Sequence, residues 1–350
     1  MNTRLLLGIM VLGLVLTAAS PVGQSEEALS RSLAWLEGQQ QPDGGYSNGY
    51  TSGSDVGTTA DVVLAVRLAG QDPSFWGPEA AHPADYLEAQ VGVGAVSGPG
   101  LAAKVALAAM ALGREPRDFG GVDLLAAARD GYDSSLGLFG GGTFDSALCV
   151  LALSLAGEPL PEGALEGILL TRLEDGSYAF NGDTTPGAGD SNTTALVVVA
   201  LAAAGETEEI APSLDYFRQV QNADNGWTYQ KPSAFGEETD ANSTALVIQA
   251  LIAAGERLED WGDPIRSLLS LQQESGAFAF NVSTPGDSML ATAQAIPALA
   301  GVDFTDVARL GAGGEASPGA VGRSTAIAVA VIVVSAVVLV IAGAAARKRG

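Results

Sequence analysis

The stretch DSNTTALVVVALAAAGE, residues 190–206, returns fifty positions later as DANSTALVIQALIAAGE, residues 240–256. Each copy begins with a short polar cluster and continues into an apolar run that closes on a glycine. The runs are rich in strong helix formers, and a glycine just past the last turn is a common helix C-cap. Because these helices are apolar on nearly every side, we expect them to be covered on both faces.

Four further apolar segments with a closing glycine extend this pattern along the chain. An amphipathic stretch precedes each segment; in residues 211–221, Leu214, Phe217 and Val220 share one helix face. A repeat of this period is typical of stacked helical hairpins. The sequence therefore predicts six buried and six half-buried helices. The closing glycines, at intervals of 43, 44, 48, 50 and 46 residues, are Gly70, Gly113, Gly157, Gly205, Gly255 and Gly301.

Six such hairpins can close head to tail into two concentric rings. We therefore predict an all-α fold, an α6/α6 toroid of six inner and six outer helices over residues 26–303. An open superhelix is the alternative, although it would need polar capping repeats at its ends. Pro297 lies in the sixth inner segment, where we expect an irregular helix.

The two ends of the chain carry apolar runs of their own. Arg4, the apolar run 5–16 and the small residues that follow are typical of a secretory signal peptide. A second run is long enough to span a bilayer, and a basic tail follows it. We expect a single-pass cell-membrane protein with an extracytoplasmic toroid and a cytoplasmic C-terminus. The predicted segments are a signal peptide at 1–22, the toroid at 26–303, a linker at 304–324, a transmembrane helix at 325–346 and a cytoplasmic tail at 347–350.

The charge of the chain is strongly negative. It has 40 acidic and 17 basic residues; five basic residues lie in or beside the two apolar ends, so the body between them carries about −28. Such a charge repels nucleic acid, which excludes DNA or RNA as a partner. It also predicts a surface adapted to high salt, where ions screen the repulsion.

The loops that precede the inner helices carry the motifs that identify the repeat. QNADNGWTY (221–229), GSYAF (176–180) and QQESGAFAF (272–280) are each followed by a polar loop and an apolar helix. These segments resemble the repeats of the terpenoid cyclase and protein prenyltransferase superfamily, and the resemblance spans about residues 26–301. It implies the toroid, which that superfamily shares with cobalamin carriers of the transcobalamin type and with complement-like thioester domains. One toroid serves several chemistries, so the resemblance does not choose a function.

Five of the six loops also carry an aromatic residue and then an acid, while VGVGAVSGPG (91–100) lacks both. Because the helices alternate, these loops should meet at one end of the ring and form a mouth. Two interpretations remain open: the polar residues cap the inner helices, or the helix N-termini together bind a polar or anionic ligand group. The candidate ligand-binding residues are Asp55, Asp145, Asp190, Asn192, Asp240, Asn242 and Asp287, with Tyr178, Trp227, Tyr229 and Phe280 as aromatic contacts.

The resemblance allows a catalytic test at the two sister motifs. Squalene–hopene cyclases protonate their substrate with a D-x-D-D-T-A motif at this place. DSNTTAL keeps the first acid as Asp190 but has Asn192 and Thr193 at the other two, and DANSTAL keeps only Asp240. An amide is no proton donor, so the general-acid role is not carried over. The inner helices also hold few aromatic residues that could stabilise carbocations.

Metal and thioester chemistry find no support in the sequence. The prenyltransferase zinc needs an Asp and a Cys two positions apart and a His, whereas Asp145 and Cys149 are four apart and the single histidine, His82, precedes an outer helix. A Cys-Gly-Glu-Gln run is absent, and Cys149 stands alone in an apolar segment, as an inert buried thiol would. We predict no metal and no obligatory cofactor, with cobalamin as one candidate ligand.

The sequence favours a toroid that binds a small molecule or a peptide at its mouth without catalysis; the small molecule could be cobalamin-like or an isoprenoid. The alternative is an enzyme similar to terpene cyclases or prenyltransferases, with Asp190, Asp240 or Asp287 as the acid. The third hypothesis is a purely structural surface module, which the absence of both a pocket and a charged rim would favour. A deep lipophilic axial pocket with Asp190, Asp240 or Asp287 at its throat would favour the enzyme, and an axis filled by side chains would favour binding at the mouth.

Overall fold

The computed structural model describes residues 21–50, 52–76, 81–234 and 236–311. Nearly all of the predicted signal peptide and the whole of the predicted transmembrane helix and basic tail lie outside these ranges. Within them, no helix combines the length and the apolar character needed to cross a bilayer.

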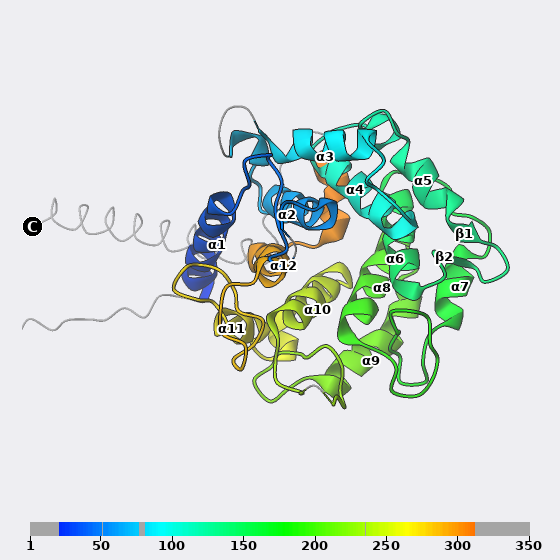
Figure 1. Ribbon diagram of the computed structural model, residues 1–350. Helices are drawn as coiled ribbons and strands as arrows, with labels where there is room; N and C mark the ends of the chain where they lie inside the picture. Colours follow the sequence, from blue (N-terminus) through cyan, green and yellow to red (C-terminus); the bar gives the residue numbers. More distant parts are fainter. Residues whose placement is uncertain (1–20, 51, 77–80, 235, 312–350) are drawn as a thin grey trace, which may run out of the picture.

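Six apolar helices form the inner ring of the molecule (Figure 1). Each packs against the next one along the chain, and the last packs against the first. The ring is therefore closed, which excludes the open superhelix. The inner helices are α2 (Val56–Leu68), α4 (Pro99–Ala111), α6 (Thr143–Leu155), α8 (Ser191–Ala204), α10 (Ala241–Ala253) and α12 (Met289–Ala300).

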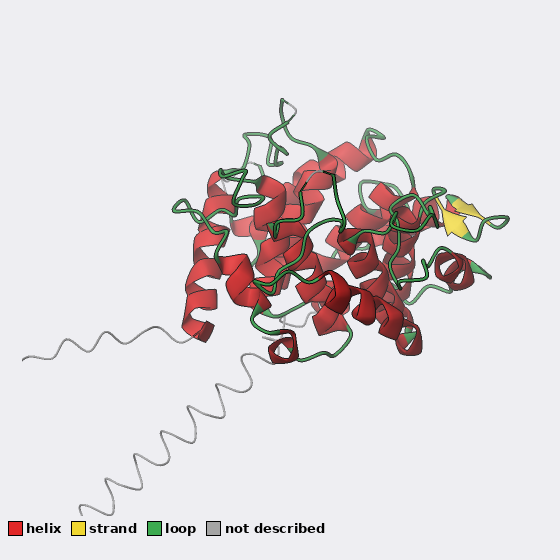
Figure 2. Cartoon of the chain, turned by 90° about the horizontal axis from the view of Figure 1, so that it is seen from below, coloured by secondary structure: helices red, strands yellow, loops and turns green. Residues whose placement is uncertain are grey.

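An outer helix precedes each inner helix, which gives the alternation that the repeat predicted. The outer helices are α1 (Pro21–Gly38), α3 (Pro83–Gly92), α5 (Leu124–Asp130), α7 (Ala164–Leu170), α9 (Ala211–Val220) and α11 (Pro264–Leu269). Almost all of the described secondary structure is helical (Figure 2). The sequence did not predict the antiparallel pair β1 (Tyr132–Asp133) and β2 (Leu138–Phe139). Single turns of 3₁₀ helix connect other elements: η1 (Pro73–Phe75), η2 (Pro116–Asp118), η3 (Thr207–Ile210) and η4 (Leu258–Trp261).

The loops before the inner helices are held to the core by a repeated hydrogen bond. The backbone N–H of Tyr178 donates to Thr194 Oγ1 at 2.9 Å, and that of Trp227 donates to Thr244 Oγ1 at 3.0 Å. Tyr46, Phe139 and Phe278 make the same bond to a Thr or Ser in the first turn of their own inner helix. All five aromatic side chains are fully buried. The polar cluster recurs because each copy anchors one such loop.

The chain continues after α12 across the end of the ring that lies opposite these loops. Its elements are η5 (Phe304–Asp306), which packs against α8 and α10, and α13 (Val307–Gly311), which packs against α2 and α4. Val307 and Leu310 are buried there. Residues 304–311 fall in the segment predicted as a linker, yet they are a packed part of the domain and close one end of its axis.

Candidate functional site

Three of the candidate carboxylates cap inner helices. The side chains of Asp55, Asp190 and Asp240 accept hydrogen bonds from the backbone N–H groups three residues further on, at 2.8, 2.7 and 2.7 Å. The capping interpretation is confirmed at these positions. Because the caps occupy the first-turn N–H groups and place negative charge there, these helix N-termini do not offer the anion site that their convergence suggested.

The other two acids take different places. Ser288 rather than Asp287 caps α12, and Asp287 accepts hydrogen bonds from Trp35 Nε1 at 3.1 Å and Ser275 Oγ at 2.7 Å. Asp145 lies in the first turn of α6, half-buried against Gly100 of α4, where an added Cβ would collide with its carboxylate. Gly100 therefore leaves room for this carboxylate beside the uncapped start of α4.

A wide pocket occupies the mouth of the ring, where the inner helices begin. Its volume is about 610 Å³, within the range of roughly 300–1,000 Å³ that is usual for small-molecule sites. We call it the mouth pocket. Six candidate residues line it, namely Asp55, Asn192, Tyr229, Asp240, Asn242 and Phe280. Six of the eleven residues predicted from the sequence therefore meet at one cavity.

The remaining candidates do not line this pocket. Tyr178 and Trp227 are 0% exposed and belong to the core, so these two expected aromatic contacts instead hold the loop turns. Asp190 is buried beneath the mouth, with both carboxylate oxygens bonded to Thr193. The aromatic residues of the loops divide by position: the first of each pair turns inward to the core, whereas Tyr229 and Phe280, two residues later, stay 44% and 40% exposed.

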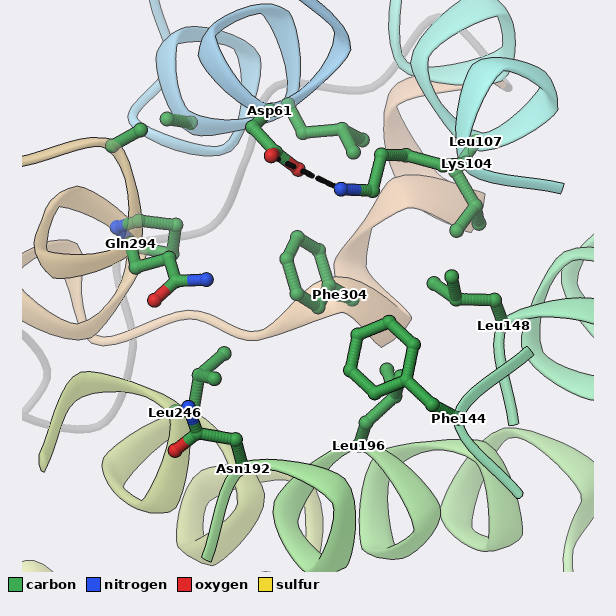
Figure 3. A pocket seen from close by; sticks show the side chains of 14 residues that line it. Asp61, Lys104, Leu107, Phe144, Leu148, Asn192, Leu196, Leu246, Gln294 and Phe304 are labelled. Carbon is green, nitrogen blue, oxygen red and sulfur yellow. Dashed lines mark hydrogen bonds and ion pairs between the residues drawn. The ribbon is translucent and has the colours of Figure 1, made fainter. Parts of the chain in front are cut away.

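An ion pair stands at the throat of the mouth pocket, facing the axis (Figure 3). Lys104 Nζ lies 2.9 Å from an Asp61 carboxylate oxygen, with the two side chains 23% and 19% exposed. Asn192 and Gln294 lie at the same level, and Gln294 Oε1 accepts a hydrogen bond from Asn242 Nδ2 at 2.8 Å. Among the residues that the structure describes, no donor reaches the buried Oδ1 of Asn192. The throat therefore holds one buried acceptor that has no hydrogen-bond partner among the described residues.

Below the throat the axis narrows to a small apolar cavity, which we call the axial pocket. It encloses only about 60 Å³, room for roughly four water molecules. Leucines from five inner helices form its wall, and Phe144 and Phe304 complete it (Figure 3). The wall is mainly aliphatic, as the sequence indicated, with two phenylalanines at its ends. The wall leucines are Leu64, Leu107, Leu148, Leu196 and Leu246.

Burial governs the titration of the acids near the mouth. Desolvation raises the pKa of Asp190 and that of Asp240 to about 6 each, against the lowering effect of their hydrogen bonds. Burial also raises the pKa of Asp145, although the Lys104 ammonium lowers it. The Cys149 thiol is buried and its pKa is raised, chiefly by desolvation, so it is a poor nucleophile. Within the described ranges, no three His, Cys, Asp or Glu side chains come together as a metal site would require.

Sequence reasoning missed Asp61 and Lys104. The signal was present: they stand nine positions before the closing glycines Gly70 and Gly113, where Leu196 and Leu246 stand before theirs. Aligning the copies on their glycines would have exposed two charges at a position that faces the axis. Phe304 was missed because it lies outside the repeats, in the segment taken as a linker.

Comparison with solved structures finds this fold in proteins of several functions. The type II terpene cyclase MstE from Scytonema, in complex with geranylgeranyl dihydroxybenzoate, matches with a TM-score of 0.60 at 14% identity, over 83% of this chain and 99% of the cyclase. Haptocorrin in complex with Cbi matches with a TM-score of 0.54 at 16% identity, over 81% of this chain and 68% of haptocorrin. An unsaturated glucuronyl hydrolase specific for heparin matches with a TM-score of 0.56 at 11% identity, over 80% of this chain and 95% of the hydrolase.

These likenesses confirm the expected fold, an α-toroid like that of the terpenoid cyclases and of haptocorrin. At identities of 11–16% they show the fold alone. The sequence matches no family model and no curated protein.

Proposed function

We propose that this chain is a binding protein that holds a small molecule in the mouth pocket without transforming it. The observation that carries the proposal is the change in width along the axis. A pocket of about 610 Å³ narrows to one of about 60 Å³, and polar side chains stand at the junction. A ligand can therefore seat a polar group at the throat while its bulk stays in the mouth. The axial pocket is too small for the folded polyene that a cyclase must enclose.

The positions of the carboxylates also support binding rather than acid catalysis. Asp190 and Asp240 are engaged as helix caps, and Asp287 lies beside the mouth pocket rather than at its throat. The acid at the throat, Asp61, is engaged in an ion pair with Lys104 and does not face the cavity as a free carboxyl group.

An isoprenoid-processing enzyme is the second candidate. Two features favour it: the axial pocket is lipophilic, and one carboxylate, Asp61, stands at its throat. The likeness to a terpene cyclase that binds a geranylgeranyl substrate adds to this reading. Cobalamin is a further candidate ligand of the mouth pocket, supported by the likeness to haptocorrin in complex with Cbi. The apolar ends of the chain support export and membrane anchoring, with the mouth available to ligands outside the cell.

Native mass spectrometry of the full-length protein tests the proposal. We expect a small molecule to stay bound to the native chain and to be lost from Asn192→Leu, which removes the unpartnered acceptor at the throat. Asp215→Asn on the outer helix α9, where the side chain is 81% exposed, is the control and should keep it. Equal retention by both variants would contradict a site in the mouth. Chemical conversion of an added polyprenyl substrate would establish the enzyme instead.

A further inference from the structure

The mouth pocket continues sideways into a second cavity that the site above does not use. This cavity encloses about 420 Å³ and shares Asn48, Tyr50, Phe280 and Ser288 with the mouth pocket. It runs towards Trp35 on α1 and Asp287 before α12, where the first and last repeats meet. We call the two cavities together the aromatic groove.

Exposed aromatic side chains concentrate in this groove. Of the four aromatic residues in the described ranges that are strongly exposed, Tyr50, Tyr229 and Phe280 line it, at 95%, 44% and 40% exposure. Trp35 adds a fourth ring, fixed by its hydrogen bond to Asp287. Apolar rings gathered along a cavity mark a binding surface, and their faces attract cations.

The charges of the groove have one predominant sign. Its lining carries four carboxylates, Asp55, Asp61, Asp240 and Asp287, and one ammonium, Lys104, which leaves a formal charge of −3. The unpartnered Oδ1 of Asn192 adds a neutral acceptor at the inner end. The groove thus offers acceptors, negative charge and aromatic faces, whereas its only cation is already paired.

We propose that the aromatic groove binds an organic cation, an amine carried on an aliphatic chain. Its ammonium groups would donate to Asp55, Asp61 and Asp287, while the buried Asp240 adds negative charge from beneath. Its methylene segments would lie on the aromatic rings. The body charge of about −28 would attract such a ligand from a distance and repel anions such as isoprenoid diphosphates. This inference rests on the proposed function and names the class of its ligand.

Calorimetric titration of the full-length protein with spermine tests the inference, with hexane-1,6-diol and cellotetraose as uncharged probes. We expect one spermine per chain, binding at least about tenfold weaker in 1 M than in 0.05 M salt. The double variant Asp55→Asn/Asp240→Asn removes two groove charges but keeps the helix caps, since Asn caps as well as Asp. It should weaken spermine binding about tenfold.

Two further variants separate the groove from the general charge of the surface. Tyr50→Ala removes a side chain that is 95% exposed, so it should leave the fold intact and weaken binding about threefold. Asp215→Asn makes the same charge change on α9 and should leave the affinity within twofold. Equal weakening by Asp215→Asn and by the groove variants would overturn the inference in favour of diffuse attraction. Binding of cellotetraose or the diol without binding of spermine would also overturn the inference of a cationic ligand. It would still support the proposed function, a mouth pocket that binds small molecules.

Discussion

The ion pair at the throat allows a test of whether its two charges serve ligand binding or the stability of the fold. The side chains of Lys104 and Asp61 are each about one-fifth exposed, so the pair is intermediate between a surface pair and a buried one. A surface ion pair contributes about 0–1 kcal/mol, whereas breaking a buried pair costs about 3–5 kcal/mol. Lys104→Met leaves Asp61 and the nearby Asp145 without a cation, so we expect it to destabilise the fold by about 2–3 kcal/mol. Asp61→Leu should cost only about 1 kcal/mol, because Lys104 still faces Asp145.

The double variant Asp61→Leu/Lys104→Met places apolar side chains where α6, α8 and α10 carry leucine. Replacing a whole ion pair with apolar groups is often close to neutral, so we expect it within about 1 kcal/mol of the native protein. Urea unfolding of the native protein, the two single variants and the double variant, followed by far-UV circular dichroism, gives the coupling energy between the two side chains. The double variant should fold but lose its ligand. Additive single effects, or a fully folded double variant that binds normally, would refute the view that this pair serves binding rather than stability.

Three other predictions concern the caps, the floor and the surface. Asp190→Asn/Asp240→Asn should be more stable than the native protein at pH 7, because burial penalises the ionised acids; a pKa raised from 3.8 to about 6 corresponds to about 3 kcal/mol for each acid, so the gain for the pair is up to about 6 kcal/mol. The gain should shrink as pH falls below about 6 and vanish below 3.8, where both acids are protonated in the folded and in the unfolded protein. A gain that grows at low pH would contradict this sign. Phe304→Ala should cost about 2 kcal/mol and enlarge the axial pocket, so that benzene raises the melting temperature of the variant but not of the native protein. The melting temperature of the native protein should rise between 0.1 M and 2 M KCl, since salt screens the repulsion across the negative surface. An unchanged melting temperature would contradict the prediction of a surface adapted to high salt.

The sequence predicted the ring because its period and its glycines are local signals. Gly205 and Gly301 do end their helices in left-handed conformation, and Asp190 and Asp240 do begin theirs. The capping chemistry follows from residue type and position within a few residues, which a single sequence records.

The binding surface was harder to predict because it depends on direction and on contacts across the ring. Residue type does not distinguish Trp227, which turns into the core, from Tyr229, which lines the mouth. The pairing of Asp61 with Lys104 joins residues 43 positions apart. The floor at Phe304 depends on how the chain turns back after the last repeat, which no repeat pattern describes.

The most direct test of the account is a crystal structure of the full-length protein with its bound small molecule. We expect new electron density in the mouth pocket, with a donor atom of the ligand within hydrogen-bond distance of Asn192 Oδ1 and the axial pocket little changed in volume. Density that fills an expanded axial pocket, or that lies only on the outer helices, would contradict a toroid that holds its ligand at the mouth.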